Sequence, residues 1–180
     1  MANRLPPTLF VLVGLPGAGK TKRARELEAT WQGLRLSPDE WMIPLFGESE
    51  ASGRRDVLEG RFVWLAMQAI LIGVTVILDF GCWAKDERSA LRHLARNAGA
   101  NCELVYLAIN ETEQQRRISG RWTDAPASTF EMGPNDLERF RRQFEVPDEE
   151  ELSGSKIGPP PSGHETWESW AAHRWPTSIA

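Results

Sequence analysis

The residues from Gly14 to Thr21 have the types and the spacing that most clearly predict chemistry. They read Gly-Leu-Pro-Gly-Ala-Gly-Lys-Thr and fit the pattern G-x-x-x-x-G-K-[ST], the P-loop or Walker A motif, whose backbone N–H groups cradle phosphates. Glycine allows backbone conformations that residues with side chains rarely adopt, and it lets the backbone approach an anion closely. The residues expected to bind the phosphates of a nucleotide are Gly14, Pro16, Gly17, Ala18, Gly19, Lys20 and Thr21.

Lys20 and Thr21 close this pattern with a positive charge and a hydroxyl group. The Lys20 ammonium group would reach the β- and γ-phosphates, and the Thr21 hydroxyl group would be a ligand for Mg²⁺. The motif therefore predicts that ATP and Mg²⁺ bind here. The alternative is a glycine-rich turn that is followed by a chance Lys-Thr pair.

Two aspartates follow apolar segments and are candidates for the rest of the site. Asp79 comes directly after residues 74–78, and a carboxylate at the end of such a strand can hold Mg²⁺. Asp39 follows the short segment 34–36, and it could orient an acceptor hydroxyl group and take its proton. Glu40 is the fallback base. For both aspartates, a helix-cap or turn role is the alternative.

Three arginines could neutralise charge in a phosphoryl-transfer transition state: Arg116, Arg117 and Arg121. They lie on and just beyond a helix that we expect over 111–119, and a solvated helix face is the alternative for each. Residues 111–144 could form a helical lid that closes over ATP. The catalytic candidates are therefore Asp39, Lys20, Arg116, Arg117 and Arg121.

The elements that must position these residues alternate between strand and helix patterns. Strands are expected at 8–13, 34–36, 74–79 and 102–109. Helices are expected from near Gly19 to about Glu28 or Thr30, from about 54 to Gly73, at 85–97, at 111–119 and at 134–144. This alternation predicts an α/β fold with a parallel sheet and right-handed crossovers. Because ligands bind beyond the carboxyl ends of such strands, the glycine loop, Asp39 and Asp79 should meet at one edge.

Apolar residues near the expected cleft have two interpretations. We expect the segment from Trp41 to Gly47 to be an apolar loop. Its side chains could form a pocket for the acceptor together with residues beyond Asp79, or they could pack helices onto the sheet. The residues concerned are Trp41, Met42, Phe46, Phe80 and Trp83.

Composition limits the classes of function. The chain has 180 residues, 41% of them hydrophobic, and a net charge of −4, which favours a single globular domain and makes nucleic acid an unlikely partner. Two cysteines without a metal-binding spacing, and no visible signal peptide, predict a reduced, cytoplasmic protein. Residues 62–78 are too interrupted for a membrane span. We expect a monomer or a homodimer.

The chain divides at about residue 152. Residues 1–152 form the expected domain, and residues 153–180 form a Pro/Gly-rich segment that contains Trp167, Trp170 and Trp175. This segment is either a disordered tail or an arm that packs its tryptophans back on the domain.

Residues 8–150 resemble a group of P-loop proteins called predicted kinases or AAA-family ATP-binding proteins. The group includes chloramphenicol phosphotransferase, zeta toxins and polynucleotide kinase. The motifs that carry the resemblance are Gly14–Thr21, Leu36–Met42 with Leu45–Gly47, Val76–Gly81 with Trp83, and Arg116–Arg121.

The resemblance implies a three-layer P-loop NTPase fold with a mostly parallel central sheet and a helical lid. It also implies that Asp39 activates the acceptor and that one of the three arginines of 116–121 acts from the lid. Polynucleotide kinases carry an arginine three residues after the base, and here that position is Met42. The departure favours a smaller and less anionic acceptor.

The resulting hypothesis is an ATP-dependent phosphotransferase that moves the γ-phosphoryl group to a hydroxyl group of a small molecule. Asp39 would be the base, and Mg²⁺ would bind with ATP. The alternatives are a polynucleotide 5′-hydroxyl kinase and a nucleotide-binding switch or ATPase without an acceptor.

Overall fold

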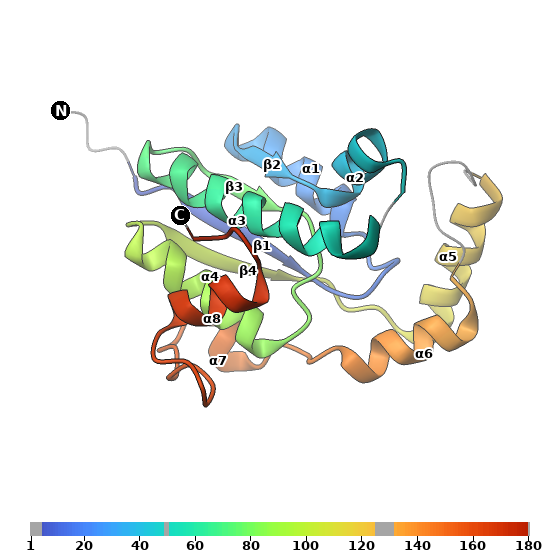
Figure 1. Cartoon of the computed structure of the whole chain (residues 1–180). Coiled ribbons are helices and arrows are strands. Elements are labelled where there is room, and N and C mark those ends of the chain that lie inside the picture. Colours follow the sequence, from blue (N-terminus) through green and yellow to red (C-terminus); the bar gives the residue numbers. More distant parts are fainter. Residues whose placement is uncertain (1–4, 49–50, 125–131, 180) are drawn as a thin grey trace.

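The computed structural model describes residues 5–48, 51–124 and 132–179, with the side chains of 51 and 121–124 left out (Figure 1). The strands are β1 (Thr8–Val13), β2 (Leu34–Leu36), β3 (Val76–Leu78) and β4 (Asn101–Tyr106). The first helices are α1 (Lys20–Trp31), α2 (Pro38–Phe46), the short 3-10 turn η1 (Ala51–Gly53) and α3 (Arg54–Leu71). They are followed by α4 (Lys85–Asn97), α5 (Glu111–Asp124), α6 (Pro134–Gln143), α7 (Glu149–Leu152) and α8 (Trp167–Arg174).

The four strands form one parallel sheet in the order β2-β3-β1-β4. Phe10 of β1 lies opposite Ile77 of β3 on one side and opposite Glu103 of β4 on the other. The predicted α/β fold is confirmed. Figure 1 shows α5 and α6 together beyond the end toward which the strands point. Within the described residues, no helix is long and apolar enough to cross a membrane.

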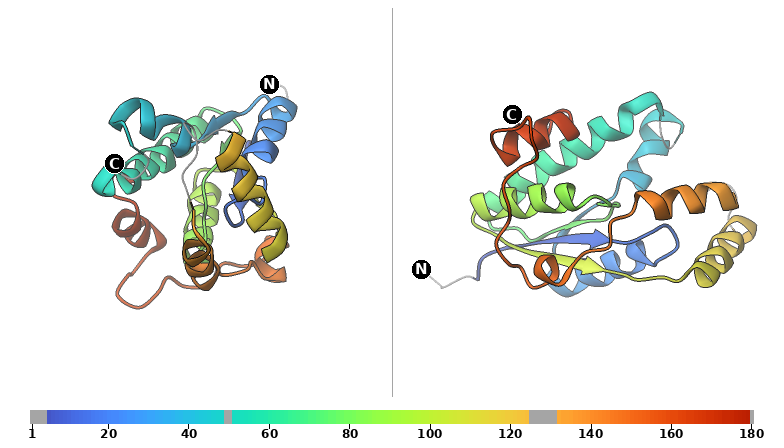
Figure 2. Two further views of the ribbon diagram at one scale, coloured as in Figure 1. Left: turned by 90° about the vertical axis from the view of Figure 1, so that its right-hand side faces the viewer. Right: turned by 90° about the horizontal axis from the view of Figure 1, so that it is seen from below.

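Helices cover both faces of the sheet, which explains why β1 is apolar along its whole length. Leu9, Val11 and Val13 belong to a core with residues of α3, α4 and α8, whereas Phe10 and Leu12 pack with residues of α1. Figure 2 shows α1 and α3 on opposite sides of the sheet. Successive side chains of a strand point to opposite faces, so each face of β1 fills its own core.

The segment from Trp41 to Gly47 is not a loop, as the sequence predicted, but most of helix α2. Pro38 occupies the first turn, where its missing N–H group costs nothing, and two acidic residues follow it at the positive end of the helix dipole. Gly47 ends the helix in the left-handed conformation, with φ of 79°. The predicted apolar loop was wrong because these helix-start signals outweigh the apolar run.

The C-terminal segment is an arm that packs on the domain, the second of the two alternatives. Trp167 and Trp175 are buried in the main core, and Trp175 is only 1% exposed. Helix α8 lies against α4 (Figure 1). The arm then crosses α3 at Gly60, where a Cβ atom would lie 1.9 Å from the carbonyl oxygen of Pro176. A glycine inside a helix is unfavourable by about 1 kcal/mol relative to alanine, so this close crossing explains its presence.

The close crossing predicts that Gly60→Ala destabilises the protein although alanine is the better helix former. Displacing the arm should lower the free energy of unfolding by roughly 1–3 kcal/mol, as measured by urea denaturation. Gly120→Ala in α5 is the matched control, because no atom of the described residues lies within 4 Å of a Cβ atom there. The control should be neutral or stabilising by up to about 1 kcal/mol. Equal effects of the two substitutions would contradict the crossing.

Candidate active site

The glycine loop joins β1 to α1 and has the backbone geometry that its sequence predicts. Gly17 and Gly19 have φ values of 82° and 97°, which favour glycine. A Cβ atom at Gly14 would lie 2.7 Å from the carbonyl oxygen of Leu107. Gly19 is the N-cap residue of α1 and has no side chain that could accept a hydrogen bond from the first turn. The first N–H groups of α1 therefore suit an anion.

Lys20 folds back over this loop. Its Nζ atom donates hydrogen bonds to the carbonyl oxygens of Gly14 at 2.9 Å and of Leu15 at 3.1 Å. The ammonium group therefore lies over the cradle of N–H groups, where a phosphate chain would enter.

Thr21 and Asp79 lie together although 58 residues separate them. The Thr21 hydroxyl group is 3.4 Å from Oδ1 of Asp79, which follows β3 and is 4% exposed. Burial raises the pKa of Asp79, and the neighbouring Arg35 guanidinium opposes that rise. A hydroxyl and a carboxylate oxygen beside a phosphate cradle are the ligands that Mg²⁺ prefers. These two residues therefore fit the ion that the sequence implies.

Arg35 of β2 joins several carboxylates and was missed by sequence reasoning. It contacts Oδ2 of Asp79 at 2.9 Å, Glu28 at 3.1 Å and Glu40 at 2.7 Å, and its side chain is 9% exposed. A charged residue in the middle of a short apolar strand is the signal that could have found it. The hydrogen bond from Arg35 lowers the pKa of Glu40, so this fallback base is a poor proton acceptor.

Asp39 lies in the first turn of α2. Its side chain is 62% exposed, and its Oδ1 atom accepts a hydrogen bond from Nη2 of Arg55 at 2.8 Å. Arg55 also contacts Glu59 at 3.1 Å, so it links the candidate base to a buried carboxylate.

A single cavity of about 800 Å³ runs from the glycine loop to Asp39 and beyond. We call its two parts the phosphate half and the acceptor half. The phosphate half is lined by Gly17, Gly19, Lys20, Thr21, Arg116 and Arg117. The acceptor half is lined by Asp39, Arg55, Asp56, Glu59, Phe80, Trp83, Glu87, Phe140 and Arg174. Asp79 lies where the halves meet. This volume is in the range of pockets that hold small ligands.

Glu59 is a second residue of the cavity that sequence reasoning missed. Burial raises its pKa from 4.5 to about 7, partly opposed by the charge of Arg55. It lies on the same side of α3 as the buried residues Phe62, Val63 and Ala66. An acidic residue on the apolar stripe of a predicted helix was the available signal, because such a group is rarely buried without a partner.

The three candidate arginines differ in position. Arg117 donates to the carbonyl oxygen of Gly17 at 3.2 Å and also contacts Glu113. Arg116 also pairs with Glu113, but its side chain is 71% exposed. The backbone of Arg121 belongs to α5, and its side chain lies outside the described residues. Arg117 is therefore the arginine that the described structure brings against the glycine loop.

The base of α5 also packs on the glycine loop. Gln114 is fully buried and donates to the carbonyl oxygen of Pro16 at 2.9 Å, and Arg141 of α6 donates to Gln114 at 2.7 Å. A Cβ atom at Gly17 would lie 3.3 Å from Ile118. The first turns of the proposed lid are thus attached to the phosphate half.

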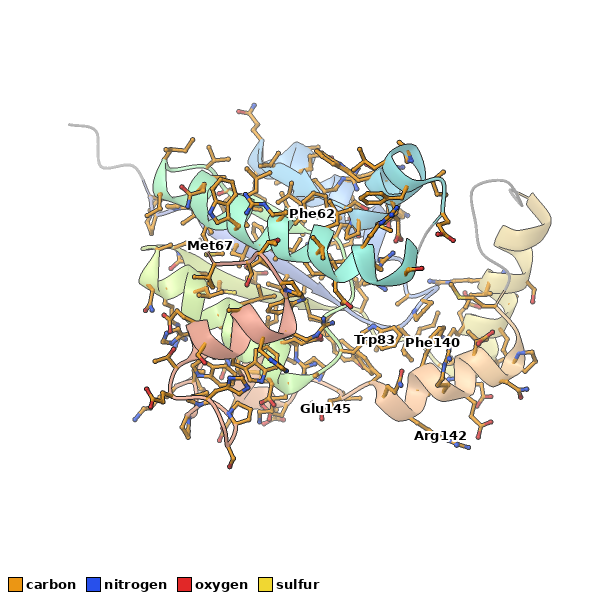
Figure 3. All side chains as sticks on the ribbon, in the orientation of Figure 1. Phe62, Met67, Trp83, Phe140, Arg142 and Glu145 are labelled. Carbon is orange, nitrogen blue, oxygen red and sulfur yellow. The ribbon has the colours of Figure 1, made fainter. Side chains whose placement is uncertain are left out.

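The apolar residues near the cleft divide between the two interpretations: some line the cavity, and others pack helices onto the sheet. Phe80 and Trp83 line the acceptor half, and Trp83 makes an edge contact with Phe140 at 5.1 Å between ring centroids (Figure 3). Met42 is fully buried in the main core. Met42 does not line the cavity. The presence of Met42 where polynucleotide kinases carry an arginine is therefore no evidence on the charge of the acceptor. Trp41 and Phe46 pack against α3 and the main core.

The raised pKa of Glu59 predicts a pH-dependent penalty on stability. The unfolded state loses this proton near pH 4.5 and the folded state near pH 7, so stability should fall as the pH rises between these values. The Glu59→Gln variant cannot ionise at this position. Its free energy of unfolding, measured with urea, should rise relative to that of wild type by roughly 1–3 kcal/mol between pH 5 and pH 8. Glu103→Gln, at an exposed position, is the control. If the free energy of unfolding of Glu59→Gln differed from that of wild type by the same amount at pH 5 and at pH 8, the assignment would be contradicted.

Solved structures of similar fold come from nucleotide-handling proteins. Kti12 from Chaetomium thermophilum in complex with ADP-AlF3 is 19% identical, with 96% of this chain and 100% of that chain covered and a TM-score of 0.61. The Mycobacterium tuberculosis APS kinase CysC in complex with AMPPNP and APS is 16% identical, with 79% and 84% covered and a TM-score of 0.56.

A third similar structure is a chain of the Pnkp1/Rnl/Hen1 RNA repair complex. It is 20% identical with a TM-score of 0.62, and the match covers 76% of this chain and 43% of that chain. The present chain thus spans less than half the length of that protein. At these identities the likeness shows the fold alone, which is the P-loop NTPase fold.

No curated protein gives a significant match to the sequence. A family model described as an AAA domain, AAA_33, matches residues 9–147, which include the glycine loop, Asp39, Asp79 and α5. The chain therefore belongs to the AAA_33 family.

Proposed function

We propose that this protein is an ATP-dependent phosphotransferase that moves the γ-phosphoryl group of ATP to a hydroxyl group of a small molecule. The observation that carries the proposal is the continuity of the cavity. The phosphate cradle, the paired Thr21 and Asp79, and Asp39 all line one space, which extends past Asp39 into an acceptor half. A site built only for hydrolysis needs room for water and no such extension.

In the phosphate half, the residues would bind and neutralise the nucleotide. The N–H groups of the loop and the first turn of α1 would hold the phosphates, and Lys20 would exchange its carbonyl partners for phosphate oxygens. Thr21 and Asp79 would hold Mg²⁺, which supplies charge neutralisation when bound. Arg117 would face the transferred group from the base of α5.

In the acceptor half, Asp39 would orient the acceptor. Its carboxylate would accept the hydroxyl proton while the acceptor oxygen bonds to the γ-phosphorus and the bond to the ADP oxygen breaks. Arg55 would hold the carboxylate in place through the contact at 2.8 Å. Charge and atoms balance, because the released proton passes to Asp39 and then to solvent.

The alternatives remain a polynucleotide 5′-hydroxyl kinase and an ATPase or switch. The first is suggested by the similarity to a chain of an RNA repair complex, and the second by the similarity to Kti12, which was solved with ADP-AlF3. The acceptor half favours a small molecule over a polynucleotide, because carboxylates outnumber guanidinium groups among its lining residues that the structure describes. The cavity beyond Asp39 favours transfer over hydrolysis.

A screen of hydroxyl-bearing metabolites and antibiotics for ATP-dependent gain of a phosphoryl mass tests the proposal. Wild-type protein should modify one compound class, and Asp39→Asn should lower kcat by at least about 10² while ADP binding stays within about twofold. Glu103→Gln is the control, since this exposed carboxylate on β4 does not line the cavity. Full transfer by Asp39→Asn would rule out Asp39 as the base.

The different positions of the two described lid arginines predict different kinetic effects. Arg117→Ala should lower kcat by about 10² or more, because Arg117 lies against the phosphate cradle. Arg116→Ala should change kcat by less than about fivefold, because its exposed side chain contacts only Glu113 among the residues that the structure describes. Single-turnover rates measure both, and the reverse order would contradict the assignment.

A further inference from the structure

We propose that the C-terminal arm completes the acceptor half, and that the acceptor is a neutral or cationic hydroxyl compound without an anionic group. The inference rests on the proposed function and adds the acceptor class and a positioning residue, Arg174. It is carried by the contacts of Arg174 and by the charge balance of the acceptor half.

Arg174 comes from the end of α8 and reaches the cavity. Its Nε atom contacts Oε1 of Glu87 at 2.7 Å, and its Nη1 atom contacts Oδ1 of Asp56 at 2.9 Å. All three side chains line the cavity. The next residue, Trp175, is anchored in the main core, and the chain after it presses against Gly60 of α3. The arm is thus a fixed wall of the site.

Two arginines of the acceptor half have the same arrangement. Arg55 joins Asp39 to Glu59, and Arg174 joins Asp56 to Glu87. Among the described residues, each guanidinium group therefore contacts two carboxyl groups, and four carboxyl groups face two arginines. An anionic group of the acceptor would place a further negative charge beside this cluster, close to the buried carboxyl groups of Glu59 and Glu87. A neutral or protonated amino group adds no negative charge there.

The aromatic side adds a second requirement. Phe80, Trp83 and Phe140 line the same half and offer ring faces. The Nε1 atom of Trp83 is buried and has no hydrogen-bond partner among the described residues. This atom lies against Gly81 and has almost no accessible surface, so the contribution of Trp83 to the cavity is its apolar ring. The chemistry therefore suits a polyol, an amino sugar or an amino alcohol with one apolar face.

Fractionation by charge tests the acceptor class before the compound itself is identified. A metabolite extract is separated by ion exchange into anionic, neutral and cationic fractions, and each is incubated with wild-type protein and γ-labelled ATP. We expect label to enter an organic product from the neutral or cationic fraction. Label entering only products of the anionic fraction would overturn the acceptor class. The absence of label from every fraction, with ATP still bound, would overturn the proposed function and the inference with it.

Arg174→Gln tests the role of the arm, with the compound identified in the labelled fraction as the probe. The acceptor KM should rise by at least about tenfold, while the Kd for ADP should change by less than about twofold. Arg61→Gln is the matched control, because Arg61 contacts the arm at Thr177 but does not line the cavity. Arg174→Lys, which keeps one charge, should lie between wild type and Arg174→Gln and serves if the glutamine variant does not fold. A wild-type acceptor KM in a folded Arg174 variant would overturn the role of the arm.

Discussion

The buried carboxylate of Asp79 connects the parts of the site. One oxygen faces the hydroxyl group of Thr21 at the start of α1, and the other binds Arg35 of β2. Arg35 in turn holds Glu40, the residue next to Asp39 in α2. A chain of charged contacts thus runs from the phosphate cradle to the candidate base. Removing one partner of a buried ion pair typically costs several kcal/mol, so the two ends of the site depend on each other.

These contacts explain why α2, the helix that carries Asp39, can be short. Helix α2 has nine residues, and isolated helices of this length are marginal in water. Its position is set by Met42 in the core on one side and by the Glu40–Arg35 contact on the other. The same apolar residues that resembled an acceptor loop therefore serve to fix the helix on which Asp39 is carried.

Much of the fold could be predicted from local patterns. The glycine loop, the apolar strand at 8–13 and the helix at 85–97 have strong signals, and the structure has these elements at the predicted places. Proximity of Thr21 and Asp79 followed from the rule that parallel strands end at one edge. Helix α2 was missed because its apolar composition obscured the signals at Pro38 and Asp39.

The acceptor half could not be predicted, because its residues come from distant elements whose contacts no local pattern encodes. Arg174 reaches Glu87 across 87 positions of sequence and Asp56 across 118. Two local features of the sequence could have pointed to this half: Gly60 lies inside a long helix, and Glu59 lies on the apolar face of that helix. Each is explained by a partner outside the helix, the arm in one case and the cavity with Arg55 in the other.

The fate of the γ-phosphoryl group tests most directly whether an alcohol or water is the acceptor. Wild-type protein is incubated with ATP and the metabolite extract in ¹⁸O-labelled water, and the masses of the products are measured by mass spectrometry. If Asp39 activates an alcohol, the phosphoryl group appears on an organic compound without ¹⁸O, and this product disappears with Asp39→Asn. If all of the γ-phosphate instead appears as ¹⁸O-labelled inorganic phosphate, at equal rates for both proteins, the protein is an ATPase and the acceptor site does not exist.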